Sequence, residues 1–252
     1  MRIVIGQRVF SQEPGHRAEV QKICKIAQAA QEVDKNIKCE LFVNKAEIYA
    51  EEKKTEIVRD IRDAVSVELD DMNLSDVDIR CHITSIYDQS VFECFSRVVR
   101  KLIPEHDHLE ALLNILVQMC KMEKAYLFDK VCKVCVAADS VNSDDRHNEI
   151  CSDMIDVFID FSCIYGMLDD MMVGDEEVYD PESFSAIKLA VGAEKGAPQT
   201  ILYLREVAPY LALVCVIRQE SFEGKMGLID YNFTQFRNKI GELIKHREEQ
   251  TT

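Results

Sequence analysis

The sequence predicts two folds in succession, an α/β domain over residues 1–104 and an α+β domain over residues 105–252. In the first part, short apolar runs alternate with stretches whose apolar residues recur three or four positions apart, the pattern of a parallel sheet with crossover helices. In the second part, strand-like runs follow one another directly between helices, which is typical of an antiparallel sheet. We place the boundary at the charged stretch PEHDH, because Pro104 ends a helix.

The composition fits two modest domains and argues against several functions. Of the 252 residues 47% are apolar, which is enough for a sizeable core. The formal net charge is -15, with acidic residues spread along the chain, so we expect no nucleic-acid partner. No apolar run approaches the ~18 residues of a spanning helix, so we expect no direct membrane insertion. Most of the ten cysteines lie in apolar runs, which indicates reduced, buried thiols in a soluble intracellular protein.

The first part alternates strands and helices. Strands are predicted at RIVIG, in CELFVNKAEIY and in VDIRCHITSIYD, and helices over residues 17–33, 51–71 and 90–103. The second strand stops abruptly at Asn44 and Lys45, as a buried parallel strand does when its end opens onto a site. The helical residues expected to face the sheet are Val20, Ile23, Cys24, Ala27, Ile57, Ile61, Ala64, Val65, Leu69, Val91, Cys94 or Phe95, Val98 and Leu102.

The second part reads as helix, two strands, helix, three strands, helix. The helices are predicted over residues 108–122, 148–166 and 228–246, and the strands at KAYLFDK, KVCKVCVAAD, FSAIKLA, TILYLREV and YLALVCVIR. Residues 167–180 and 192–198 are predicted surface loops. An α+β domain of this kind often pairs edge to edge or helix to helix. The inward residues of the last two helices are expected to be Ile150, Met154, Val157, Phe158, Phe161, Leu228, Phe233, Phe236, Ile240 and Ile244.

A lone CxxC pair does not predict a metal or redox site. Cys132 and Cys135 lie in a run that alternates like a strand, which would point the two sulfurs to opposite faces. Zinc would also need two more converging ligands. Ordinary packing is the preferred interpretation.

Two further groups of polar residues are interpreted as structural. Asp153, Asp156 and Asp160 share one helix face opposite the apolar stripe, so we expect a solvated face rather than a carboxylate metal cluster. No Ser/His/Asp or Cys/His arrangement rises above chance. We therefore predict no catalytic residue and no metal site, although three histidines fall near the sheet end and the domain junction: His82, His106 and His108.

Asn44, Lys45 and Glu47 match the guanine-recognition motif NKxD, with Glu in place of Asp. In that motif the amide reads the purine edge, the lysine stem covers the ring, and the carboxylate accepts two hydrogen bonds from guanine N1 and N2. Thr84, Ser85 and Ile86 follow the next strand, where a second loop would touch the base. Four such letters after a strand also arise by chance, but two loops at neighbouring strand ends favour guanine binding.

The phosphate-binding part of a nucleotide site is missing from this sequence. It contains no GxxxxGK[ST] and no strand-terminal DxxG preceding the guanine motif. Without the loop lysine, its backbone nest and the magnesium-binding hydroxyl, phosphate binding loses most of its stabilisation. We expect no magnesium site and no GTP hydrolysis by this chain alone.

Taken together, these residues resemble the heterodimeric Rag GTPases, and most closely their C/D type. The resemblance is carried by LFVNKAE, TSIYDQSVFECFSRVVRKLIP, LEALLNILV, EKAYLFD, CSDMIDVFIDFSCIYG, ILYLREV, LALVCVIRQESFE and GLIDYNF, which run from about residue 38 to 244. It implies an α/β partial small-GTPase domain, truncated at the N-terminus and lacking P-loop and switches, over residues 1–104. An α+β roadblock/longin-like heterodimerisation domain would follow over residues 105–252.

The resemblance also implies a function and partners. The family binds GTP or GDP and signals amino-acid sufficiency to the target-of-rapamycin complex. The implied partners are an A/B-type Rag subunit, a lysosomal scaffold of roadblock proteins and the target-of-rapamycin complex itself, with a cytoplasmic protein recruited to the lysosome or vacuole surface. The alternative is a non-enzymatic roadblock-type interaction or scaffold protein with a vestigial G domain.

Overall fold

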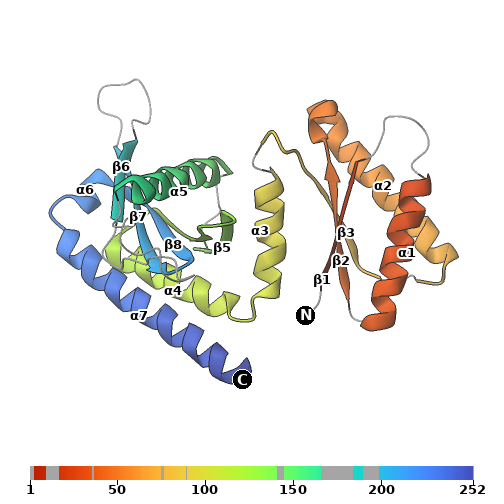
Figure 1. Ribbon diagram of the computed structural model, residues 1–252. Coiled ribbons are helices and arrows are strands. Elements are labelled where there is room, and N and C mark those ends of the chain that lie inside the picture. Colours follow the sequence, from red (N-terminus) through yellow and green to blue (C-terminus); the bar gives the residue numbers. More distant parts are fainter. Residues whose placement is uncertain are drawn as a thin grey trace. The chain divides into compact units, whose positions relative to one another are not determined.

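The computed structural model describes residues 3–9, 17–35, 37–74, 77–88, 90–140, 145–165, 184–189 and 199–251. The chain forms two compact units, residues 1–102 and residues 103–252 (Figure 1). Each unit contains one sheet and its own helices. No helix among the described residues is both long enough and apolar enough to cross a membrane.

The first unit is a three-stranded parallel sheet covered on both faces. Its strands are β1 (Ile3–Val9), β2 (Lys38–Asn44) and β3 (Ile79–Ile83), in the order β1-β2-β3. Helices α1 (Arg17–Val33) and α2 (Glu51–Asp71) bury their stripes against Cys39, Leu41 and Val43 of β2. Helix α3 (Ser90–Leu102) packs on Phe42, on the opposite face. Because both faces of β2 are covered, its last six residues are buried.

The predicted helix stripes of this unit are correct at their centres and wrong at their margins. Ile61, Val65 and Leu69 are buried, as expected. Ala64, however, is exposed. In α3 the buried residues include Cys94 and Val98, whereas Leu102 is 39% exposed. A helix packed on a narrow sheet buries only a narrow stripe, so residues at the edge of that stripe remain in solvent.

The second unit is a five-stranded antiparallel sheet, as predicted, between two helical layers. Helices α4 (His106–Cys120) and α7 (Met226–Thr251) cover one face and α5 (Asp145–Tyr165) covers the other (Figure 1). The short helix α6 (Gln219–Phe222) follows the last strand. The sheet has the order β5-β4-β8-β7-β6, with strands β4 (Lys124–Asp129), β5 (Val134–Ala138), β6 (Phe184–Leu189), β7 (Thr200–Ala208) and β8 (Leu211–Arg218).

Helix α7 buries the aromatic residues expected of it, but its stripe is shifted at both ends. Phe233, Phe236 and Ile240 are 1%, 4% and 1% exposed. Leu228 and Ile244 were also expected inside, yet they are 49% and 37% exposed. Ile229 takes the inward position at the first turn, because it stands four residues before Phe233 and therefore directly above it on the helix.

Helix α5 corrects the prediction for two large apolar residues. Met154 and Phe158 are buried against the sheet as expected, together with Ile155. Val157 and Phe161, which were assigned to the same inward stripe, are 43% and 61% exposed. Apolar residues thus occupy two sides of this helix, and the sheet covers only one of them.

The CxxC pair is not part of one strand. Asp129 Oδ1 accepts hydrogen bonds from the amides of Val131 and Cys132, and Lys133 has a positive φ of 54°. This turn delays β5 until Val134, so Cys132 is exposed in the turn while Cys135 is buried in the strand. The predicted loops at residues 167–180 and 192–198 lie outside the described residues.

Candidate functional site

Strands β2 and β3 end side by side, and their last hydrogen bonds join the two loops of the predicted site. The amide of Thr84 donates to Val43 O at 2.8 Å, and the amide of Ala46 donates to Thr84 O at 3.1 Å. The backbone pairing therefore continues beyond the strands. Because these are backbone bonds, the relative position of the two loops is rigid.

The first loop turns sharply at Asn44 and Lys45. Asn44 is 7% exposed, and its Oδ1 accepts a hydrogen bond from the buried Thr84 hydroxyl. Lys45 has a φ of 65° and a ψ of 42°, a left-handed conformation that costs a non-glycine residue about 1–2 kcal/mol. A 3-10 helix η1 (Ala46–Ile48) begins immediately afterwards. The turn leaves the side chains of Lys45 and Glu47 exposed beside the buried Asn44.

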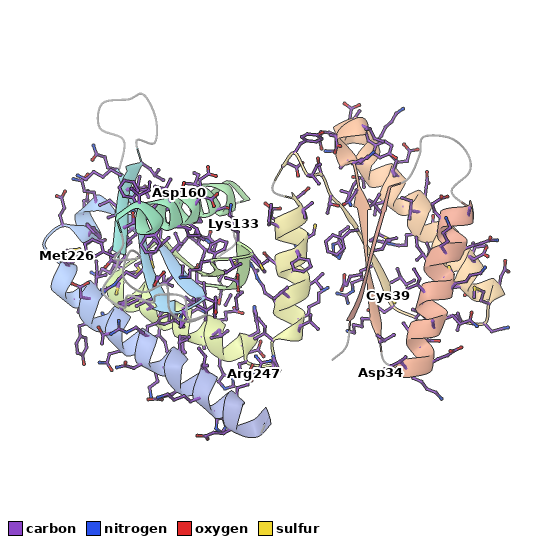
Figure 2. All side chains as sticks on the ribbon, viewed as in Figure 1. Asp34, Cys39, Lys133, Asp160, Met226 and Arg247 are labelled. Carbon is purple, nitrogen blue, oxygen red and sulfur yellow. The ribbon has the colours of Figure 1, made fainter. Side chains whose placement is uncertain are left out.

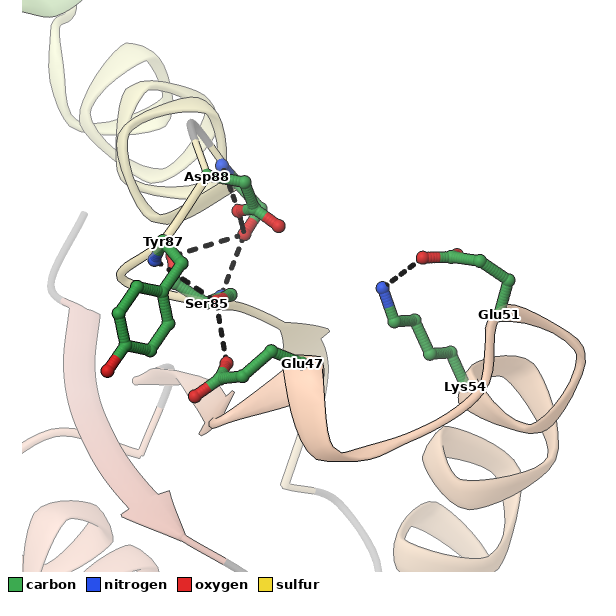
Figure 3. A network of polar contacts seen from close by, with 7 residues as sticks. Glu47, Glu51, Lys54, Ser85, Tyr87 and Asp88 are labelled. Atoms are coloured by element: carbon green, nitrogen blue, oxygen red, sulfur yellow. Dashed lines mark hydrogen bonds and ion pairs between the residues drawn. The ribbon is translucent and has the colours of Figure 1, made fainter.

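Glu47 is tied to the second loop by Ser85 (Figure 3). The Ser85 hydroxyl donates to Glu47 Oε2 at 2.6 Å and accepts the amide of Tyr87 at 3.2 Å. The amide of Ser85 in turn donates to the hydroxyl of Ser90, the first residue of α3, at 2.8 Å. Ser85 is 1% exposed, so this exposed carboxylate is held by a hydroxyl whose own position is fixed.

A buried ionic cluster lies behind the loops and links the three elements that carry them. The side chain of Glu40 on β2 is fully buried, with its Oε2 2.6 Å from His82 Nε2 on β3 and its Oε1 2.6 Å from Lys101 Nζ on α3. Burial by itself raises the pKa of Glu40, but the hydrogen bonds and charges of Lys101 and His82 outweigh it and lower the pKa. The cluster fixes β2, β3 and α3 together below the loops.

The arrangement suits recognition of a flat, hydrogen-bonding ring. Glu47 presents a carboxylate whose direction is set by Ser85, and this restraint offsets the freedom of the methylene by which Glu exceeds Asp. Lys45 contributes an aliphatic stem at the same edge. Ile86 and Tyr87 are 74% and 79% exposed on the second loop, where they offer apolar surface beside the carboxylate. These residues fit a guanine base, whose N1 and N2 groups need a paired acceptor.

The structure thus brings five of the six predicted residues into one connected group. Asn44, Glu47, Thr84 and Ser85 are joined by hydrogen bonds, and Lys45 forms the turn between two of them. Ile86 lies on the second loop but has no such bond among the described contacts.

Sequence reasoning missed Glu40 and Tyr87. A charged residue inside the buried run CELFV was the signal that could have identified Glu40. Tyr87 gave no separate signal, because it stands in a loop, where the sequence pattern does not predict whether an aromatic side chain is buried or exposed.

Among the described contacts, the other polar residues singled out in the sequence make none with the six predicted site residues, although His82 stands two positions before Thr84. His82 is engaged by Glu40, and Asp156 forms an ion pair with Lys133 at 2.5 Å. His106 begins α4, with its Nδ1 3.8 Å from Asp107 Oδ1. In the part of the chain that the structure describes, no group of three or more His, Cys, Asp or Glu residues is placed to hold a metal ion.

Comparison with known proteins assigns the chain to a family. Residues 9–155, more than half of the chain, match the family model of the Gtr1/RagA G protein conserved region. The chain therefore belongs to the Gtr1/RagA family of G proteins.

Within that family the relatives are of the C/D type, as the sequence motifs predicted. The chain is 45% identical over 216 residues to Ras-related GTP-binding protein C of Homo sapiens, and 41% identical over 215 residues to GTP-binding protein gtr2 of Schizosaccharomyces pombe. These matches cover 86% and 85% of this chain, and 51% and 66% of the two relatives. The chain spans about half the length of the mammalian C and D proteins that it matches.

Among solved structures, alignments of low similarity are found. Myxococcus xanthus MglB aligns with a TM-score of 0.41 at 14% identity, over 57% of this chain and 92% of that protein. A roadblock/LC7 domain from Streptomyces avermitilis aligns with a TM-score of 0.37 at 12% identity, over 54% of this chain and 97% of that domain.

Proposed function

We propose that this chain is a subunit of a heterodimeric, Rag-type guanine-nucleotide-binding protein. The observation that carries the proposal is the convergence of Glu47, Lys45 and Ser85 at the carboxyl edge of a parallel sheet, in a chain that belongs to the Gtr1/RagA family. Ligands of open parallel sheets bind at this edge. The relatives' names, which describe GTP-binding proteins, support the same ligand.

Guanine recognition would be performed by the two joined loops. The Glu47 carboxylate would accept the hydrogen bonds of guanine N1 and N2, and the Lys45 stem would cover one face of the ring. Adenine lacks this donor pair and would leave the carboxylate unpaired, so the loops would discriminate between the two bases. The phosphates would have to be bound by elements outside these 252 residues.

Partner binding is supported by two features of the second unit. Strand β6 is the last strand of the sheet, and among the described residues no strand pairs with its outer edge; its residues alternate between exposed and half-buried. On the helix layer, Val157, Phe161 and Ile164 are 43%, 61% and 69% exposed and form an apolar stripe along α5. Such a strand edge and an uncovered stripe in one α+β unit favour pairing with a similar unit, and the proposed partner is an A/B-type Rag subunit.

The wider role that we propose is the one implied by the resemblance to the Rag GTPases. The heterodimer would signal amino-acid sufficiency to the target-of-rapamycin complex, from a cytoplasmic pool recruited by a roadblock-protein scaffold to the lysosome or vacuole surface. A second candidate function is a non-enzymatic interaction protein with a vestigial G domain. The position of the whole pairing surface in the second unit favours it, since β6 and α5 share no residue with the guanine loops.

The base-recognition proposal can be tested by exchanging one atom type. Glu47→Gln keeps the length of the side chain but turns one acceptor into a donor, so it should lose guanosine and gain xanthosine, which carries a carbonyl at C2. Binding would be followed by NMR titration with millimolar nucleoside, reading the amides of Ser85 and Tyr87. Glu51→Gln is the matched control, because Glu51 is a nearby exposed carboxylate that pairs only with Lys54 in the described contacts (Figure 3). If guanosine shifts none of these amides in the wild type, the scaffold function is the better account.

A further inference from the structure

Helix α5 carries, beside its apolar stripe, a row of acidic residues that bears on the choice of partner. Asp153 and Asp160 are exposed on α5, seven residues apart and therefore on one side of the helix; we call them the acidic ridge. Figure 2 marks Asp160 on α5 and Lys133 beside this helix. Lys133 neutralises Asp156 through an ion pair, but no ion pair between described side chains includes either residue of the ridge.

The helix geometry places the ridge next to the stripe. Residues three, four and seven apart share a helix face, so Asp153 neighbours Val157, and Asp160 neighbours both Val157 and Ile164. The side that packs on the sheet carries Cys151, Met154, Ile155 and Phe158. Among the described side chains of α5, the surface that remains for a partner therefore carries apolar residues beside negative charge.

A second copy of the chain would fit this surface poorly. Consider two copies that pair through their α5 helices about a two-fold axis perpendicular to their sheets. The two helices then run antiparallel on the same face of the paired sheets, and both acidic ridges lie on the side of the helix pair that faces away from the sheets. The two acidic ridges would then lie on neighbouring helices, and the repulsion between their like charges would disfavour association. The net charge of -15 adds repulsion between copies.

We propose that the acidic ridge selects the partner of this unit: a similar α+β unit whose corresponding helix carries Lys or Arg beside an apolar stripe. The inference rests on the proposed heterodimer and adds the reason why the chain pairs with a different subunit rather than with itself. The apolar stripe supplies the affinity common to both pairings. The ridge makes the difference between them, because charge complementarity rewards a basic partner and penalises an acidic one.

The first experiment needs only this protein. Asp153→Lys with Asp160→Lys turns the ridge basic without touching a buried residue, and an equimolar mixture of this double variant with the wild type recreates the proposed complementarity. Sedimentation equilibrium at 50 mM salt should show the mixture associating about tenfold more tightly than the wild type alone. The gain should shrink at 0.5 M salt, where screening acts within ~5 Å. A mixture that associates no more tightly than the wild type overturns the proposal.

The second experiment separates this inference from the heterodimer on which it rests. Binding of a purified A/B-type Rag subunit would be compared for the wild type, the ridge double variant and Phe161→Glu, with Glu242→Lys plus Glu249→Lys on α7 as a control of equal charge change. Phe161→Glu should abolish binding at every salt concentration, and the ridge variant should weaken it about tenfold at low salt only.

The outcomes are distinguishable. Loss of binding with Phe161→Glu, but not with the ridge variant, overturns the role of the ridge and leaves the heterodimer standing. No binding by the folded wild type overturns the proposed heterodimer, and the mixing experiment then still decides whether the ridge sets the pairing preference.

Discussion

Truncation of Phe236 to Ala should destabilise the fold of the second unit rather than merely weaken its association. Phe236 lies on α7, is 4% exposed and belongs to the same core cluster as Phe233, Ile240 and Leu113. Removing a buried phenylalanine side chain typically costs about 3–5 kcal/mol through lost burial and the cavity that remains. This is a large share of the ~5–15 kcal/mol that stabilises a domain. Phe233→Ala should cost at least as much, because the Phe233 ring also lies 4.3 Å below the buried Arg205 guanidinium.

The assay is urea denaturation of the full chain, followed by circular dichroism and compared with Tyr231→Ala. Tyr231 stands on the same helix and is 63% exposed, so its truncation should change the free energy of unfolding by less than about 0.5 kcal/mol. The competing view is that Phe236 belongs to a subunit interface. In that case Phe236→Ala would leave the denaturation curve unchanged and abolish only partner binding, and such a result would refute the core assignment.

Three further predictions concern other parts of the chain. Glu40→Gln should lower the free energy of unfolding of the first unit by about 3 kcal/mol at neutral pH, because it leaves Lys101 without its buried counter-charge and alters the group that meets His82. Since the pKa of Glu40 is lowered in the folded state, its contribution to the free energy of unfolding is present above the unfolded pKa of ~4.3 and is lost as the pH falls through the folded pKa. Urea titrations from pH 3 to 7 should therefore show that the free energy of unfolding falls less steeply with decreasing pH in the variant than in the wild type. A polypeptide of these 252 residues should bind GTP weakly or not at all, because base contacts alone must offset the ordering cost, and submicromolar affinity by calorimetry would contradict this. Residues 105–252 expressed alone should fold and bind an A/B-type Rag subunit; a fragment that stays unfolded, also in the presence of that subunit, would show that the boundary is wrong.

The local pattern of the sequence was sufficient for the order of the strands and the long helices, but not for the short helices η1 and α6. Helical spacing identified α1, α2 and α7, and apolar runs identified β2, β7 and β8, because backbone geometry repeats every 3.6 residues in a helix and every two in a strand. The NKxE and TSI motifs could be placed at strand ends for the same reason, since each follows a buried run directly. The two motifs whose residues are neighbours in sequence could thus be identified without a structure.

Contacts between distant residues had to come from the tertiary structure. The Ser85 hydroxyl reaches Glu47 across 38 positions, and Lys101 reaches Glu40 across 61, which no local pattern encodes. The hydrogen bond from Ser85 restrains the Glu47 carboxylate, and in the proposed site this restraint would compensate for the longer side chain of glutamate at the aspartate position of the motif. Lys130 and Glu206 likewise form a buried ion pair across 76 positions, which the local sequence pattern could not predict.

Which apolar residues are covered was also decided by packing. Val157 and Phe161 have the helical spacing of core residues, and so does Leu228, but periodicity shows only that residues share a face of the helix. Whether that face meets a sheet depends on where the sheet lies and how wide it is. By itself the sequence determined that α5 is an amphipathic helix, and it assigned Val157 and Phe161 to the inward stripe. Only the tertiary structure decided which of these residues are core, because the sheet of this unit covers a single side of α5 and leaves the stripe of Val157, Phe161 and Ile164 to solvent or a partner.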